Sequence, residues 1–499
     1  MHTIKELGGG KLFILPVISG VLLAFTLPPF NLTWLVWYSL IPLFLFINTS
    51  GISSKKVFWG GVVAGVIYFG KVTYPLLSLN AWGWLKVSGI LWENKILILF
   101  LILSAAVLFS GILLGLFSLL FKRITREDFS PIAPLTILPL CWILFEYLRA
   151  KISLGFTWGN LGYALHDSPF LLQLSVFGGV YVLSVLVVFV NIILFFIARE
   201  TLHHIGKMKG VNLFHAMCGS FFRNPHLYVF IGIILFANVY GYFSIKNLPT
   251  ILPQSYLSIA LVQPGRDYVA ENEPRVLRDI TKALRKNPAM ILIPESAFPS
   301  ILLNEDTGEP QKHTETTQPA VRSSYQHLID LSETYSDTSF VVGLVSMQDK
   351  SRYSSLVVLE GGHITSIYHK RILFPFSERS VAWFPFKTVG ALAEGENAKG
   401  ITIKGDAVSA LICSEILFPK LIKSDTSRFI VAIGTDGVFD SPLVAEQNHI
   451  IAKFAAVSTR KYLLRAMKTG VSSIIDPSGR DLVRSRSQEK ELLYGEIFP

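Results

Sequence analysis

One stretch decides how the second half of this 499-residue chain is interpreted: Ala407-Val408-Ser409-Ala410-Leu411-Ile412-Cys413-Ser414-Glu415. Its apolar run predicts a buried β-strand that ends at the thiol of Cys413, and residues Ile416 to Ile422 predict a helix behind it. A thiol at the start of a helix faces backbone N–H groups and the positive end of the helix dipole. Both favour the thiolate, which is the nucleophilic form. Cys413 is therefore a candidate nucleophile, and the alternative is that it is a small buried hydrophobic residue.

The first half of the chain has a different composition. The whole chain is 51% hydrophobic and only 16% charged, whereas soluble domains carry about 25% charged residues. The deficit lies in residues 1–250, and a bilayer crossing needs about 20 apolar residues. Seven apolar segments approach that length: 11–29, 32–48, 57–79, 96–121, 131–148, 170–198 and 226–246. We therefore predict a multi-pass transmembrane domain of about seven helices over residues 1–250.

The charges between these segments predict an orientation. Successive loops of a multi-pass protein lie on alternate sides of the membrane. The loops of one side carry most of the cations: Lys5, Lys11, Lys55, Lys56, Lys122, Arg123, Arg126, Arg199, Lys207, Lys209 and Arg223. The opposite set carries only Lys86, Lys95, Arg149 and Lys151. Because cytoplasmic loops are enriched in Lys and Arg, the N-terminus is expected in the cytoplasm and everything after the seventh helix on the outer side. The net charge of +10 is partly this signal. No basic cluster interleaved with aromatic residues indicates nucleic-acid binding.

Residues 251–490 read as a soluble α/β domain, followed by a polar C-terminal tail at 491–499. Strands are predicted near 256–262, 289–293, 340–345, 407–412, 429–433 and 472–475, with helices near 276–280 and 323–335. The pair Gly361-Gly362 lies between two further strand-like runs, which indicates a hairpin.

Three positions at predicted strand ends carry reactive side chains. Glu295 follows a strand that should be buried, so its carboxylate would be partly desolvated and a better base. Lys370 closes the hairpin, and Cys413 is the thiol described above. Each has a plain alternative, because loop glutamates are often merely solvated and hairpin lysines often face solvent. The order Glu, Lys, Cys, with each residue at a strand end, favours a shared site.

These blocks resemble the nitrilase superfamily. The resemblance rests on Pro294-Glu295, on Tyr368-His369-Lys370-Arg371-Ile372-Leu373-Phe374-Pro375-Phe376-Ser377-Glu378 and on Cys413-Ser414-Glu415. The membrane half adds Trp142-Ile143-Leu144-Phe145-Glu146-Tyr147-Leu148-Arg149, Gly155-Phe156-Thr157-Trp158, Gly162-Tyr163, Gln173, Gly178-Gly179-Val180-Tyr181 and Asn191. Together they resemble the apolipoprotein N-acyltransferases, a membrane-embedded family of that superfamily. The resemblance covers the chain from about residue 10 to 485. For the residues of the membrane half, the alternative is that they serve ordinary packing and interfacial anchoring.

The resemblance implies a nitrilase-type αββα sandwich after the membrane domain and roles for its residues. Cys413 would attack a phospholipid acyl ester and form a thioester, with Glu295 as base and Lys370 stabilising the oxyanion. Glu378 and Glu415 would orient Lys370 and tune its charge, and a non-catalytic salt bridge is the alternative for both. The acceptor would be the N-terminal amine of a diacylglyceryl-modified lipoprotein. The implied location is the bacterial inner membrane, with the catalytic domain in the periplasm.

No cofactor is expected, and the eleven histidines show no spacing that predicts a metal site. Aromatic residues at 381–386 predict either a lipid-facing lid or core packing. Arg149 and Lys151 are expected either to pair with lipid phosphates or to serve as interfacial anchors.

The sequence departs from the family pattern at several points. Ser414 replaces an aromatic residue, Thr435 and Val438 replace the Asn and Trp of a downstream block, and Lys468 replaces an Asn. The family's usual transmembrane helix after the catalytic domain has no expected counterpart. Two other functions therefore stay open, a membrane-tethered nitrilase-like amidase and a degenerate lipid- or lipoprotein-binding paralogue.

Overall fold

The chain forms two compact units. The computed structural model describes residues 11–77, 86, 88–89, 91–125, 132–152, 157–207, 225–248, 256–266, 273–298, 301–309, 319–382, 384–396, 401–418, 421–422, 426–437 and 441–498. The first unit is Met1–Pro75 with Ile98–Lys246, and the second is Asn247–Pro499 with Leu76–Leu97. The segment between the helices α4 and α5 therefore belongs to the second unit, and the predicted division at residue 250 stays a prediction.

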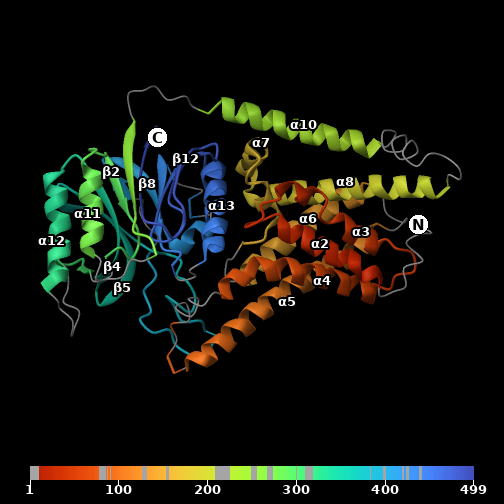
Figure 1. The fold of residues 1–499 in the computed structure, drawn as a ribbon, viewed down its shortest axis with the longest axis horizontal. Helices are drawn as coiled ribbons and strands as arrows, with labels where there is room; N and C mark the ends of the chain where they lie inside the picture. Colours follow the sequence, from red (N-terminus) through yellow and green to blue (C-terminus); the bar gives the residue numbers. More distant parts are fainter. Residues whose placement is uncertain are drawn as a thin grey trace. The chain divides into compact units, whose positions relative to one another are not determined.

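The first unit is helical, and Figure 1 shows it in red to yellow-green. Its elements are η1 Lys11–Phe13, α2 Ile14–Phe25, η2 Thr33–Trp37, α3 Ile41–Ile47, α4 Ser54–Thr73, η3 Tyr74–Leu77, α5 Trp92–Ile124, α6 Ala133–Ile152, η5 Leu161–Leu165, α7 Pro169–Leu172, η6 Gln173–Phe177, α8 Val180–Lys207 and α10 Pro225–Lys246. Each of the seven predicted apolar segments thus contains helix.

Four helices in the described part of the chain are long and apolar enough to cross a membrane. They are Ser54–Leu77, Asn94–Ile124, Val180–Leu202 and Pro225–Lys246. The segments Ile14–Phe25 and Thr33–Ile47 form shorter apolar helices, and α6 carries Glu146, Arg149 and Lys151 near its end. The chain is accordingly a membrane protein, and seven crossings stay a prediction.

Small residues and buried amides hold these helices together. A Cβ added to Gly61 or Gly65 of α4 would lie 2.7 Å from the Cα of Gly115 or Gly111 of α5, so only glycine permits this approach. The break between η2 and α3 leaves backbone groups without helical partners. Asn191 satisfies two of them, accepting from Leu40 N (2.9 Å) and donating to Val36 O (2.9 Å).

The second unit contains two β-sheets. The first has the order β13-β1-β2-β4-β5-β6, with β3 paired to β4. Its strands are β1 Leu257–Gln263, β2 Met290–Ile293, β3 Leu302–Asn304, β4 Ser339–Gln348, β5 Ser351–Glu360, β6 His363–His369 and β13 Glu491–Ile497. The second has the order β12-β11-β10-β9-β8-β7. Its strands are β7 Ile401–Ile403, β8 Asp406–Ile412, β9 Phe429–Gly434, β10 Tyr462–Met467, β11 Ser473–Ile475 and β12 Asp481–Arg484.

Apolar side chains join these sheets into a four-layer sandwich. In β1, Ile259 and Leu261 enter the core between the sheets, whereas Ala260 and Val262 pack under helices, as the alternation of a strand requires. Helices α11 Glu273–Leu284 and α12 Pro319–Thr334 cover the outer face of the first sheet, and α13 Pro442–Thr459 covers the second (Figure 1). The αββα sandwich predicted from the sequence is confirmed.

Two local predictions differ from the structure. The helix expected behind Cys413 is only the five-residue 3-10 turn η8 Cys413–Leu417. The predicted tail at 491–499 contains β13, which pairs antiparallel with β1 along its whole length. The first sheet therefore extends to residue 497 of the chain.

Candidate active site

The ends of several strands bring the three predicted residues together. In the first sheet β2 and β4 run parallel, and β6 runs the same way because two antiparallel pairings separate it from β4. Glu295 follows β2 and Lys370 follows β6, so both lie at one sheet edge. In the second sheet β8, β9 and β10 are parallel, and Cys413 follows β8.

Cys413 occupies a strained turn. Its φ of +53° lies in the left-handed region, which costs a non-glycine residue free energy and is frequent at functional sites. The neighbouring strand β9 approaches this turn closely, because a Cβ on Gly434 would lie 2.9 Å from the Cys413 Cα. The sulfur lies 3.7 Å from Thr435 O, to which the thiol donates.

The thiol of Cys413 is protonated at neutral pH, which corrects the sequence prediction of a favoured thiolate. Burial, together with the carboxylates of Glu295, Glu378 and Asp436, raises its pKa to about 12 despite the lowering effect of the Lys370 ammonium. The short turn η8 does not supply the helix dipole that was expected. A nucleophilic role at this position therefore requires a base.

Glu295 is placed to be that base. A Cβ on Gly343 of β4 would lie 2.6 Å from the Glu295 Cα, so the strand holds this turn closely. Ser354 Oγ donates to Glu295 Oε1 (3.0 Å), while Ser354 O accepts from Lys370 N (2.9 Å). The second oxygen, Glu295 Oε2, is buried and has no hydrogen-bond partner among the described residues. Burial raises the pKa of this carboxyl group, and the Lys370 ammonium opposes the increase.

Lys370 is a fully buried cation held by an acidic partner. Its side chain is 0% exposed, and Nζ lies 2.7 Å from Glu378 Oε1. Burial alone would lower the pKa of Lys370, but the acidic groups of Glu378, Cys413 and Glu295 outweigh it and keep the pKa raised. The site therefore holds a permanent positive charge next to the thiol and the carboxylate.

The two supporting glutamates do different things. Glu378 binds the Lys370 ammonium and also accepts from Phe374 N (2.6 Å), so it fixes the lysine to its own loop. Glu415 has no hydrogen bond to the lysine. Its carboxylate instead accepts from the backbone N–H groups of Arg371, Ile372 and Ile412 and from the hydroxyl of Tyr368. Glu415 thus links the turn that carries Cys413 to the loop that follows Lys370.

Three contributors were not predicted from the sequence. Ser354 lies inside a strand with no motif, and only the hairpin register brings it to Glu295. Lys86 comes from the segment between α4 and α5, where its N–H donates to Phe376 O (3.1 Å) and its carbonyl accepts from Val389 N. Arg465 forms a buried ion pair with Asp436 (3.4 Å) behind the thiol. No local sequence signal identifies any of them.

The aromatic segment at 381–386 packs in part. Phe384 contacts the buried ring of Phe376 with centroids 5.0 Å apart, and Phe386 contacts Phe384 at 5.6 Å. Trp383 and Val438 lie outside the described residues.

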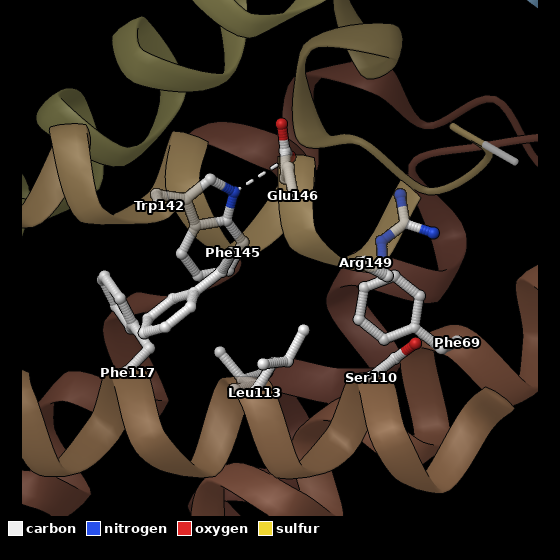
Figure 2. A pocket seen from close by; sticks show the side chains of 9 residues that line it. Phe69, Ser110, Leu113, Phe117, Trp142, Phe145, Glu146 and Arg149 are labelled. Atoms are coloured by element: carbon white, nitrogen blue, oxygen red, sulfur yellow. Dashed lines mark hydrogen bonds between the residues drawn. The ribbon is translucent and has the colours of Figure 1, made fainter. Parts of the chain in front are cut away.

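A second polar cluster lies in the first unit, around a cavity between α4, α5 and α6 (Figure 2). Glu146 accepts from Trp142 Nε1 (2.9 Å) and Leu161 N (2.8 Å). Arg149 donates to Thr157 O (3.2 Å) and to the Asn160 side chain, and its guanidinium lies over Phe69. Arg149 is only 6% exposed. It therefore pins the loop after α6 rather than pairing with lipid phosphates or anchoring at the interface.

Among the described residues, no group of three or more His, Cys, Asp or Glu side chains is arranged to hold a metal ion.

Comparison with known proteins covers most of the chain. Residues 19–193 match the apolipoprotein N-acyltransferase N-terminal domain, and residues 258–498 match the carbon-nitrogen hydrolase family. The apolipoprotein N-acyltransferase of Geobacter metallireducens is 25% identical over 97% of this chain and 89% of its own length. The apolipoprotein N-acyltransferase of Coxiella burnetii is 25% identical over 97% of this chain and 94% of its own length. A solved amidase from Nesterenkonia sp. is 19% identical over 50% of this chain and 93% of its own, with a TM-score of 0.38.

Proposed function

Because this chain belongs to the apolipoprotein N-acyltransferase family, we propose that it moves a fatty acyl chain from a membrane phospholipid to the N-terminal amine of diacylglyceryl-modified lipoproteins. The observation that carries the proposal is the cluster around Cys413. A partly buried thiol, a fully buried ammonium and a carboxylate with one oxygen that has no partner among the described residues influence one another's protonation. Glu295, Lys370 and Cys413 are the proposed catalytic residues.

The first half-reaction makes a thioester. Because the pKa of the Cys413 thiol is raised to about 12, the thiol is protonated at pH 7, so the proton must leave during attack. Glu295 Oε2 takes the thiol proton while the sulfur attacks the ester carbonyl carbon. The oxyanion that forms is stabilised by the Lys370 ammonium and by backbone N–H groups beside Cys413. The C–O bond then breaks, and the lysophospholipid oxygen leaves with the proton held by Glu295.

The second half-reaction transfers the acyl group. The neutral α-amine attacks the thioester carbonyl and Glu295 removes an amine proton. The C–S bond breaks as the amide forms, and the thiolate recovers its proton. The same carboxylate therefore serves both steps, which suits one site that receives two lipid substrates in turn.

The location proposed for this reaction follows from the loop charges. We place the N-terminus in the cytoplasm and the second unit on the periplasmic side of the inner membrane, where phospholipid donor and lipoprotein acceptor share one surface.

The N-termini of lipoproteins test this function. In cells that depend on this chain, mass spectrometry is expected to find triacylated N-termini with wild type and with Cys141→Ser, which removes the other free cysteine in the described structure. Diacylated N-termini are expected with Cys413→Ser. Diacylated N-termini with the wild-type chain would favour an amidase, and triacylated N-termini with Cys413→Ser would favour a binding paralogue.

A further inference from the structure

Lys468 lies at the carboxyl end of β10, at the same sheet edge as the nucleophile. Its N–H donates to Gly434 O (2.9 Å), and Gly434 is the residue whose Cα faces the Cys413 turn. Its carbonyl accepts from Gly265 N (3.0 Å). The backbone of Lys468 is therefore fixed from both sides, one strand beyond β9 and two beyond β8.

The other sheet brings Glu295 to this place. Strand β10 packs against β2 across the sandwich, and Lys468 and Glu295 each follow the last residues of these two strands. The Lys468 side chain is half-buried. Burial lowers its pKa, and the facing Glu295 carboxylate opposes this by stabilising the ammonium.

The charges around Glu295 indicate that a second cation is needed to stabilise its ionised form. Lys370 is already bound to Glu378 at 2.7 Å, so one ammonium serves two partly buried carboxylates, and like charges disfavour ionisation of both. Lys86 is exposed, so solvent and salt screen its charge more strongly than that of a half-buried group. Among the described residues, the charged groups that act on the ionisation of Glu295 are Lys370, Glu378 and Lys86, and Glu295 in turn acts on the ionisation of Lys468 and Cys413.

We propose that Lys468 is a positioning residue of the proposed reaction: its ammonium stabilises the ionised form of Glu295 and so keeps this carboxylate available as the base. The inference rests on the proposed function for its role in catalysis, but the electrostatic link is a property of the folded chain alone. It also gives a reason for a cation where the family pattern has a neutral asparagine.

The test is the pH dependence of Cys413 alkylation by iodoacetamide in the full-length, detergent-solubilised protein. Mass spectrometry of the Cys413 peptide follows the rate. Alkylation requires no acyl donor, so its outcome is separate from that of the phospholipid reaction. The acid limb of the curve of alkylation rate against pH reports the apparent pKa of the coupled carboxylate and thiol.

Lys468→Asn and Lys468→Met are both expected to shift this acid limb upward by about 0.5 to 1 pH unit. The rate on the limb would fall roughly three- to tenfold, since one pH unit corresponds to a factor of ten. Lys468→Arg is expected to keep the wild-type limb.

Lys461→Asn is the matched control, because it makes the same change just before the opposite end of β10. It is expected to leave the limb unchanged. A wild-type limb in both neutral Lys468 variants would overturn the inference, and so would an equal shift in Lys461→Asn. Absence of phospholipid transfer by the wild-type chain, together with a shifted alkylation limb in the neutral Lys468 variants, would instead count against the proposed function and leave the electrostatic link standing.

Discussion

At the scale of single residues, the site is built from charges that hold one another in place. The Lys370 side chain is fully buried, and its acidic neighbours keep it charged. Glu295 keeps one oxygen tied to Ser354 and the other unpartnered. The thiol has a high pKa, so the geometry supports proton transfer during attack rather than a standing thiolate.

Replacing Glu378 by Gln should move the alkaline limit of the reaction downward. Glu378 is the strongest influence that raises the pKa of Lys370, and burial acts in the opposite direction. Without this carboxylate, the lowering effect of burial on the pKa of Lys370 is less opposed, so the ammonium loses its proton at lower pH. The pH profile of thioester formation measures this, with Glu491→Gln on β13 as control. An unchanged alkaline limb would show that Lys370 does not depend on Glu378 for its charge.

Glu415→Gln should destabilise the fold. The carboxylate accepts four hydrogen bonds, from three backbone N–H groups and Tyr368. An amide would place an NH₂ group against donors, at a cost of about 2 to 4 kcal/mol in the free energy of unfolding. Thermal unfolding measures the loss. Glu491→Gln, which removes the charge from a single partly exposed bond to Arg486 N, should cost much less, and an equal loss in both would contradict the assignment.

At the scale of elements, close contacts between strands and turns determine where the side chains of the site lie. Gly434 of β9 permits the Cys413 turn to approach, and Gly343 of β4 does the same for Glu295. Neither glycine forms a motif in the sequence, because the requirement arises from another strand. The strands that precede Glu295, Lys370 and Cys413 were predictable from their apolar runs, and so was the hairpin at Gly361-Gly362.

Other elements were not predictable for physical reasons. Helix α13 is buried on nearly all its surface, so it has no amphipathic pattern. Strand β13 consists mostly of half-buried residues at a sheet edge, and its sequence was interpreted as a polar tail. Ser354 and Lys86 join the site only through register and loop placement, and these depend on the tertiary fold.

Gly434→Ala should lower the rate of thioester formation at least tenfold while leaving the chain folded. The added methyl group would lie 2.9 Å from the Cys413 Cα and 3.1 Å from Met467 Cε, so the nucleophile turn must shift, and small displacements of a nucleophile are costly. Rates of labelled-phospholipid incorporation measure the effect. Gly232→Ala in α10, where the methyl group meets nothing within 4 Å, should keep the wild-type rate, and equal rates in both would refute the prediction.

At the scale of the whole molecule, composition separates a membrane-embedded unit from a sandwich unit, and this division was readable from the sequence. The apolar stretches and the loop charges required no knowledge of tertiary structure. The segment Leu76–Leu97 is the exception, since it lies between two apolar helices and yet belongs to the second unit.

The two ends of the chain should lie on opposite sides of the membrane. If the chain makes the seven predicted crossings with the cation-rich loops inside, the N-terminus lies in the cytoplasm and the second unit outside. Membrane-impermeant labelling of tags at each end of the chain in intact cells measures this. Labelling of the C-terminal tag alone is expected, and labelling of both tags or of neither would contradict an odd number of crossings.

The central claim is that phospholipid acylates Cys413, and trapping the acyl group tests it most directly. The purified full-length chain is incubated with phospholipid labelled in its acyl chains, and bound label is then challenged with neutral hydroxylamine, which cleaves thioesters. The account predicts hydroxylamine-sensitive label on the Cys413 peptide in wild type and Cys141→Ser, and none in Cys413→Ser. Absence of label on wild type, under conditions that acylate an active relative, would contradict it.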